Sequence, residues 1–308
     1  MNLIDIFDIT VDKKYADVAV EHNENTITFY ELKNKAVSLA NYLLKKIGVS
    51  LNKPIAVFLP KEINTVISDI GILYSGNAFM NLDVKMPKER INNILKKIKP
   101  TAIITDKRYF EMFKKVDISI IDIENIEKDL DVLFINKQIN RQIDTDPMCI
   151  INTSGSTGTP KGVVLNYRSF FDFTDWAVET FSFNGSEVIG SLSPVVFDIF
   201  DFELCLLVLK GSKLVLLDSS LAIFPANLLK KINNCGVNFI FWVPSIMVNI
   251  ANLNLLSKIS LPNLKMIWFA GEVFPTKQFL YWYDYVPSAT FVNLYGPIEI
   301  TLDCTYYI

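Results

Sequence analysis

Short apolar segments of strand length alternate with segments of helical periodicity along most of this chain. In the second half, strands are predicted at 213–217, 237–242, 264–269 and 290–294, and helices at 224–234, 245–256 and 275–284. Strands that alternate with helices usually pair in parallel, with the helices covering the sheet. The pattern therefore predicts an α/β protein with mostly parallel sheets.

The N-terminal half shows the same alternation. A helix is predicted over 29–47, because Thr28 and Glu31 have the spacing of a capping box ahead of an apolar periodic segment. Residues 55–59 are continuously apolar, which is typical of a strand buried on both faces. Residues 123–146 are charged and lack periodicity, so we expect a surface connection there.

Composition excludes several classes of function. The chain has 308 residues, of which half are hydrophobic, and this suits one large domain or two linked subdomains. The net charge of −3 offers no basic excess for a nucleic acid. His22 is the single histidine of the sequence, which argues against a His-ligated metal and against a Ser-His-Asp mechanism.

Cysteine spacing and the termini bear on the compartment. The four cysteines form no CxxC pattern, and the N-terminus has no basic region of a signal peptide, so we predict a reducing, cytoplasmic compartment. The uncharged stretch 232–257 contains Pro244 and six Asn. These residues would be costly in lipid, so we interpret the stretch as buried core and expect no membrane association.

The strongest local motif is the segment Thr153-Ser154-Gly155-Ser156-Thr157-Gly158-Thr159-Pro160-Lys161-Gly162, which lies between two predicted strands. Its glycines let the backbone turn tightly, while hydroxyl groups, amides and Lys161 can surround an anion, most naturally phosphates. The order of a Walker A loop is absent. On composition alone, a plain flexible turn is the alternative.

This string resembles the phosphate-loop signature of the adenylate-forming enzymes, which include acyl-CoA synthetases, luciferases and the adenylation domains of peptide synthetases. The segment 293–299, Asn-Leu-Tyr-Gly-Pro-Ile-Glu, resembles the N-x-Y-G-P-T-E motif of that family. Ala-Gly-Glu at 270–272 is similar to the family's glycine turn beside the acyl site. Weaker matches at 28–32 and 81–91 complete the family's order, so the resemblance covers essentially the whole chain.

The resemblance implies a fold of two stacked αβα subdomains with mostly parallel sheets. A phosphate-loop subdomain would span 54–178, and residues 1–53 plus 179–308 would form the acid and adenine pocket. Residues 1–308 would be an incomplete AMP-binding core, because the family's T-G-D motif, β-barrel completion and C-terminal domain with its catalytic Lys are absent. We therefore expect a fragment, or half of a split enzyme whose C-terminal part is a separate chain.

The resemblance also implies an activity, in which ATP and a carboxylic acid form an acyl-adenylate. The acyl group then passes to a thiol, either the phosphopantetheine of a carrier protein or CoA. Lys161 and Glu299 would be the catalytic residues, with Glu299 as the ligand of Mg²⁺, an ion that prefers hard oxygen ligands. Around the β- and γ-phosphates the family places Thr153, Ser154, Gly155, Ser156, Thr157, Gly158 and Lys161.

The remaining nucleotide contacts come from the two other motifs. Tyr295 would stack on the adenine, and Asn293 would hydrogen-bond its edge. Read alone, Tyr295 is better interpreted as a core aromatic residue, and Glu299 as a carboxylate at the start of a helix; the matched motif favours the functional roles. Outside the phosphate loop, the nucleotide-binding residues that the resemblance implies are Gly271, Glu272, Asn293, Leu294, Tyr295, Gly296 and Ile298.

The segment 193–201 aligns with the F-D-x-S segment of amino-acid-activating domains, in which the Asp binds the α-ammonium group of the substrate. Asp198 follows an apolar strand, and a buried carboxylate needs a cationic partner. The alternative is that Asp198 caps a helix that begins near Ile199. The other pocket residues implied are Ile199, Phe202, Trp242, Trp268, Ala270 and Leu302. They are apolar, which favours a small or apolar amino acid such as alanine or proline.

Two departures from the family pattern leave other functions open. Ile298 stands where the motif has Thr, which removes a donor near the α-phosphate, and Tyr167 stands where a His usually follows the phosphate loop. The first prediction is an amino-acid adenylating ligase. An acyl-CoA or aryl-acid ligase core and a non-catalytic nucleotide-binding module are the alternatives.

Overall fold

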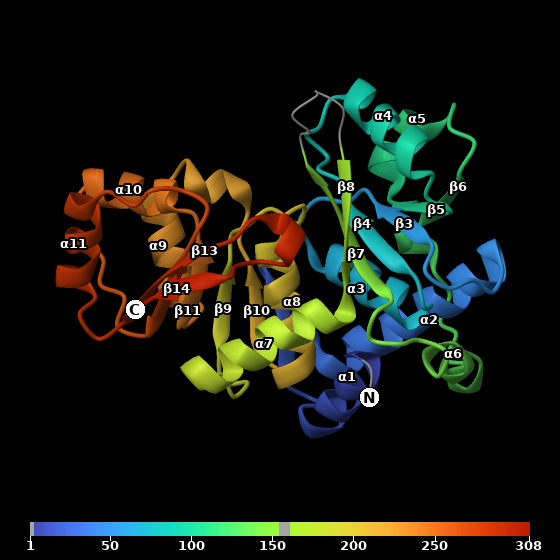
Figure 1. Ribbon diagram of the computed structural model, residues 1–308, viewed down its shortest axis with the longest axis horizontal. Coiled ribbons are helices and arrows are strands. Elements are labelled where there is room, and N and C mark those ends of the chain that lie inside the picture. Colours follow the sequence, from blue (N-terminus) through green and yellow to red (C-terminus); the bar gives the residue numbers. More distant parts are fainter. Residues whose placement is uncertain (1–2, 154–160) are drawn as a thin grey trace. The chain divides into compact units, whose positions relative to one another are not determined.

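The computed structural model describes residues 3–153 and 161–308, which divide into two compact units (Figure 1). The first unit contains Met1–Val18 and Ile27–Thr174, and the second contains Ala19–Thr26 and Asp175–Ile308. Each unit is built around one mostly parallel sheet covered by helices. The α/β class predicted from the alternation of apolar segments is confirmed.

The sheet of the first unit has six strands in the order β6-β5-β3-β4-β7-β8. All neighbours pair in parallel except β7 and β8, which form an antiparallel hairpin. The strands are β3 (Pro54–Val57), β4 (Ala78–Asn81), β5 (Ala102–Thr105), β6 (Ser119–Asp122), β7 (Pro147–Thr153) and β8 (Lys161–Asn166).

Helices cover both faces of this sheet. Apolar residues of α4 and α5 pack with residues of β3, β4 and β5 in one buried cluster. Elsewhere in the unit α2 packs against α3, where a Cβ atom on Gly71 would come within 2.8 Å of Leu39 Cδ2 and 3.0 Å of the Ala36 carbonyl oxygen. The helices are α1 (Leu3–Lys13), α2 (Phe29–Ile47), α3 (Ile63–Tyr74), α4 (Lys88–Ile98), α5 (Phe110–Phe113) and α6 (Val132–Ile139), with the short 3₁₀ segments η1 (Lys107–Tyr109) and η2 (Ile123–Asn125).

The sheet of the second unit has eight strands in the order β14-β13-β12-β11-β9-β10-β1-β2. The five central pairings from β13 to β1 are parallel, and β14 pairs antiparallel with β13 at the edge. The strands are β1 (Val18–His22), β2 (Asn25–Thr28), β9 (Val188–Ser191), β10 (Lys213–Leu216), β11 (Phe239–Trp242), β12 (Met266–Phe269), β13 (Thr290–Tyr295) and β14 (Thr305–Tyr307).

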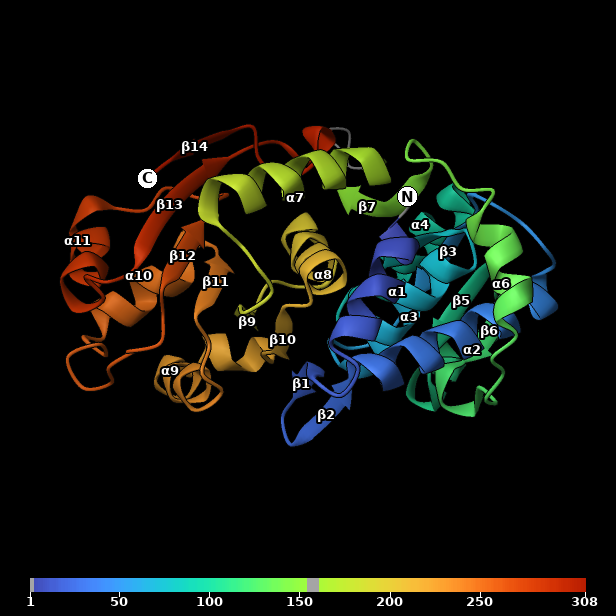
Figure 2. The same cartoon turned by 90° about the horizontal axis from the view of Figure 1, so that it is seen from below.

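Figure 2 shows α8 on one side of β9 and β11, with α9 and α10 on the other. Apolar residues of α9, α10 and α11 form one buried cluster with β10, β11 and β12, whereas Phe202 of α8 stacks on Trp268 from the opposite face. The helices of this unit are α8 (Asp198–Lys210), α9 (Pro225–Asn234), α10 (Pro244–Asn252) and α11 (Thr276–Tyr285), with η3 (Ser219–Ala222) and η4 (Ile298–Ile300). The boundary between the two units falls within α7 (Tyr167–Phe181), after Thr174.

Two features differ from the expectations. Most of residues 1–53 belong to the first unit, because α2 packs on α3. The segment 123–146 is not a plain surface connection, since it contains α6. Asp131 caps that helix by accepting a hydrogen bond from the Phe134 amide at 3.0 Å, and Ile135 and Ile139 are buried.

The uncharged stretch 232–257 forms the end of α9, then β11 and α10, so its interpretation as buried core is confirmed. Within the described ranges, no helix is long and apolar enough to cross a membrane. The four cysteines are free thiols: Cys149 and Cys205 are buried, Cys235 is half-buried, and Cys304 is exposed at the edge of the sheet.

Candidate functional site

A cavity of about 520 Å³ lies in the second unit, where the parallel strands end. Ligands of open α/β sheets bind in this position, outside the carboxyl ends of the strands. Residues that directly follow β9, β11, β12 and β13 form its walls, and the start of α8 and the segment before β14 complete it. Its lining includes Leu192, Ser193, Pro194, Phe197, Asp198, Ile199, Ser219, Ala222, Trp242, Val243, Ile246, Ala270, Gly271, Glu272, Gly296, Leu302 and Asp303.

Asp198 is the first residue of α8 and lies in the wall of this cavity. Burial raises the pKa of its carboxyl group, while backbone amides, first that of Leu302 at 3.2 Å, oppose the rise. The helix N-terminus also favours a negative charge at this place. Phe197 is the N-cap and makes no side-chain capping bond, so Asp198 projects from the first turn instead of capping the helix.

The segment before β14 is held against the end of β13 by a close backbone approach. A Cβ atom on Gly296 would lie 2.4 Å from the Leu302 carbonyl oxygen and 2.5 Å from Asp303 Cα, so this position accepts glycine only. Thr301 and Leu302 both have positive φ, at +67° and +61°. Residues other than glycine rarely adopt this backbone conformation. Here it accompanies the turn that brings Leu302 and Asp303 into the wall of the cavity.

The predicted acid-pocket residues fall into two groups. Asp198, Ile199, Trp242, Ala270 and Leu302 line the cavity.

Phe202 and Trp268 lie outside that lining, in a buried aromatic cluster on the sheet face that α8 covers. Their rings stack in parallel, with centroids 5.4 Å apart.

The residues predicted to contact the nucleotide also lie near the ends of β12 and β13. Gly271, Glu272 and Gly296 line the cavity, and Leu294 is buried. Asn293, Tyr295 and Glu299 are exposed, with Tyr295 at 67%. Glu272 also has a structural contact, because its Oε2 accepts a hydrogen bond of 2.8 Å from the Ser245 amide in the first turn of α10.

The phosphate loop belongs to the first unit. Thr153 ends β7 and pairs with Lys161 at the start of β8, so the hairpin brings the two ends of the loop together. Lys161 is exposed and Thr153 is partly buried. The predicted contacts Ser154, Gly155, Ser156, Thr157 and Gly158 lie outside the described residues.

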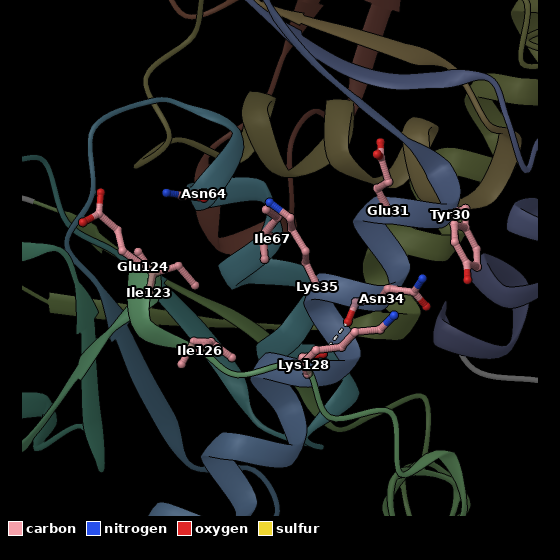
Figure 3. Close-up of a pocket in the computed structure, with 11 residues that line it drawn as sticks. Tyr30, Glu31, Asn34, Lys35, Asn64, Ile67, Ile123, Glu124, Ile126 and Lys128 are labelled. Carbon is pink, nitrogen blue, oxygen red and sulfur yellow. Dashed lines mark hydrogen bonds between the residues drawn. The ribbon is translucent and has the colours of Figure 1, made fainter.

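A second cavity, of about 560 Å³, lies within the first unit and is drawn in Figure 3. Its side chains come from α2, from Asn64 and Ile67 of α3, and from residues 123–128 (Figure 3). The lining combines two lysines, Lys35 and Lys128, with Glu31 and Glu124. It includes none of the predicted site residues, and its charges favour neither an anion nor a cation.

Several lining residues of the first cavity were not expected from the sequence. Leu192, Val243 and Ile246 come directly after strands or at a helix start, and a general search of strand ends would have included them. Asp303 is the unexpected charged residue. Burial and the negative charge of Asp198 raise the pKa of Asp303 to about 7.

Metal ligands are sparse in the described part of the chain. Across residues 3–153 and 161–308, no three His, Cys, Asp or Glu side chains are grouped so that they could hold a metal ion. Glu299 is therefore a single exposed carboxylate. This is compatible with Mg²⁺ that takes most of its ligands from substrate phosphates and water.

Comparison with known proteins gives one family. The sequence matches the AMP-binding enzyme family over residues 7–307. It is 28% identical over 288 residues to the D-alanine--D-alanyl carrier protein ligase of Staphylococcus haemolyticus, a match that covers 94% of this chain and 57% of the ligase. The chain thus spans a little more than half the length of this relative.

Solved structures agree on the fold. The complex of VinN with L-aspartate superposes with a TM-score of 0.83 at 21% identity, covering 98% of this chain and 77% of VinN. The nonribosomal peptide synthetase FmoA3, in its α-methyl-L-serine-AMP bound form, gives a TM-score of 0.86 at 19% identity, covering 100% of this chain and 34% of that protein. The matched motifs, the two mostly parallel sheets and the family match agree with one another. This chain therefore belongs to the AMP-binding, adenylate-forming enzymes and corresponds to part of their N-terminal core.

Proposed function

We propose that this chain binds an amino acid in the cavity of the second unit and supplies it for ATP-dependent adenylation. The observation that carries the proposal is Asp198, a partly buried carboxylate in the wall of the cavity, held by the Leu302 amide, whose pKa is raised by burial. A buried carboxylate is stabilised by a cationic partner, and the α-ammonium group of an amino acid is such a partner. A fatty or aryl acid brings no cation to this place.

The proposed reaction joins a carboxylate oxygen of the amino acid to the α-phosphorus of ATP, and pyrophosphate leaves. Asp198 orients the substrate through its ammonium group, which leaves the carboxylate free to react. Lys161 and the hydroxyl groups of the phosphate loop would bind the β- and γ-phosphates. Tyr295 and Asn293, both exposed at the end of β13, would contact adenine, and Glu299 would hold Mg²⁺.

The proposed second step is transfer of the aminoacyl group to a carrier-protein thiol: the sulfur loses its proton and bonds to the acyl carbon, the bond from that carbon to the phosphate oxygen breaks, and AMP leaves. The staphylococcal relative is named for loading D-alanine onto a carrier protein. VinN is known in complex with L-aspartate, and FmoA3 in an α-methyl-L-serine-AMP bound form. These likenesses support an amino acid as substrate and a carrier protein as acceptor, with CoA as the alternative.

ATP–pyrophosphate exchange tests the proposal with matched pairs of acids, such as alanine against propanoate. It would be run on this chain and on the chain extended by any sequence that its gene encodes beyond Ile308. We expect exchange with one or more amino acids and none with the same acids lacking the amino group. Equal exchange with the amine-free acids would overturn the amino-acid assignment in favour of an acyl ligase.

Ile298 favours a second candidate, a nucleotide-binding module without turnover. It stands where the family motif has Thr, so a donor near the α-phosphate is missing. ATP binding by calorimetry without exchange, in both forms of the protein, would support this candidate and contradict the ligase.

A further inference from the structure

A second carboxyl group lines the same cavity as Asp198. Asp303 follows the two positive-φ residues Thr301 and Leu302 and lies directly before the edge strand β14. The adjacent Cys304 amide donates a hydrogen bond of 2.9 Å to the Tyr295 carbonyl oxygen, which fixes the backbone on that side. Asp303 is therefore held in the wall by the fold and does not belong to a freely moving terminus.

The charges of the cavity do not balance. Its described lining holds three carboxyl groups, those of Asp198, Glu272 and Asp303, and no Lys, Arg or His. Glu272 accepts a hydrogen bond from the Ser245 amide, and Asp198 accepts one from the Leu302 amide. Within the described chain, no donor is hydrogen-bonded to the Asp303 carboxyl group.

A neutral amino acid would leave this imbalance in place. Its single ammonium group can neutralise one carboxylate, and the second would remain partly buried without a cationic partner in the described lining, which is unfavourable. We propose that the amino acid bound in this cavity carries a second amino group on its side chain, and that Asp303 binds this group while Asp198 binds the α-ammonium group. The inference rests on the proposed function and names its substrate class, a diamino acid.

The remaining walls suit the carbon chain of such a substrate. Phe197, Ile199, Trp242, Ile246 and Leu302 are apolar, so methylene groups between the two amines would pack against them. Burial and the charge of Asp198 raise the pKa of Asp303, and an ammonium group bound beside it would lower that pKa again. An uncharged side chain, as expected from the apolar motif positions alone, leaves Asp303 without a role.

Ornithine and norleucine form the sharpest pair of probes, because they differ by a terminal ammonium group in place of a methyl group. Binding of each would be measured by isothermal titration calorimetry, and exchange by the pyrophosphate assay, together with 2,4-diaminobutyrate and lysine to set the length. We expect at least one diamino acid to bind about tenfold or more tightly than its neutral counterpart, because the neutral counterpart lacks the charge-assisted hydrogen bond from the side-chain ammonium group to Asp303.

Asp303→Asn gives the second arm of the test. We expect it to weaken binding of the diamino acid until the preference over its neutral counterpart is lost. Asp284→Asn, at an exposed position on α11, is the matched control and should change neither.

The outcomes separate the two claims. If neutral amino acids bind in an Asp198-dependent manner while ornithine and its homologues do not, the diamino assignment is overturned and the proposed function stands. If no amino acid binds or supports exchange, both are overturned.

Discussion

The backbone amide of Leu302 donates a hydrogen bond of 3.2 Å to Oδ2 of Asp198, which joins the segment before β14 to the first turn of α8. These residues are 104 positions apart in the sequence. The same segment carries Asp303, so this contact joins Asp198 to the backbone beside Asp303, and these are two of the three carboxyl-bearing residues that line the cavity. The geometry of the acid pocket therefore depends on how the chain turns between β13 and β14.

Gly296→Ala should disrupt this turn. Its new Cβ atom would lie 2.4 Å from the Leu302 carbonyl oxygen, so the segment that carries Leu302 and Asp303 must move. We expect a loss of about 1–3 kcal/mol in the free energy of unfolding and weaker binding of the amino acid. Urea unfolding and calorimetry check both effects. Wild-type stability and affinity in the variant would show that the close approach is not required.

Ile298→Thr should increase the rate of adenylation. The restored hydroxyl group would donate to the α-phosphate as charge develops there, and such a donor contributes on the order of tenfold or more. The expected result is a higher maximal rate of pyrophosphate exchange with little change in the KM for the amino acid. Ile298→Val is the control, because it changes the size of the side chain without adding a donor. Equal rates in the wild type and both variants would show that the side chain at position 298 does not contribute to adenylation.

Asp303→Asn should change how stability depends on pH. Asp303 titrates near pH 7 in the folded protein and near 3.9 in an unfolded chain. The folded state therefore binds more protons between these values, and the stability contributed by this residue falls as pH rises from about 4 to 7. Above pH 7 its contribution stays level.

The measurement compares the ligand-free wild type with Asp303→Asn by urea unfolding at pH 5 and pH 8. The variant should gain stability relative to the wild type between these pH values, by on the order of 2 kcal/mol. Parallel pH profiles would mean that Asp303 titrates normally, and that the cavity does not bury it.

Thr28→Ala tests the capping box of α2. The Thr28 hydroxyl accepts a hydrogen bond of 3.2 Å from the Glu31 amide, and the Thr28 amide donates one of 2.9 Å to the Glu31 carboxylate. Loss of the cap should lower the free energy of unfolding by about 1 kcal/mol. Thr276→Ala, at the exposed start of α11 where no side-chain cap is present, is the matched control. Equal losses in the two variants would contradict a specific role of the cap.

Much of the fold follows from local sequence. The spacing of Thr28 and Glu31 predicted a helix at 29–47, and α2 has those bounds. The helix α6 was missed because its eight residues span about two turns, too short for a periodic signal among charged neighbours. It forms because Ile135 and Ile139 are buried by tertiary packing, which no local pattern reports.

The site was less accessible from sequence. Alignment with the family motifs predicted Asp198, Ile199 and Trp242 as acid-pocket residues, and all three lie in the cavity wall. It does not distinguish the two faces of a strand end, so it also named Phe202 and Trp268, whose rings stack in the core. Asp303 lines the cavity only because Gly296 admits a close backbone approach, and this depends on a contact between segments.

The most direct test of the central claim is amino-acid-dependent ATP–pyrophosphate exchange in the wild type, Asp198→Asn and the exposed control Asp284→Asn. Removing one partner of a buried charge pair costs about 2–5 kcal/mol, so Asp198→Asn should lose at least about 30-fold in exchange, while Asp284→Asn should match the wild type. Exchange in Asp198→Asn at the wild-type rate would contradict the account, because the ammonium group would then be bound elsewhere or not at all.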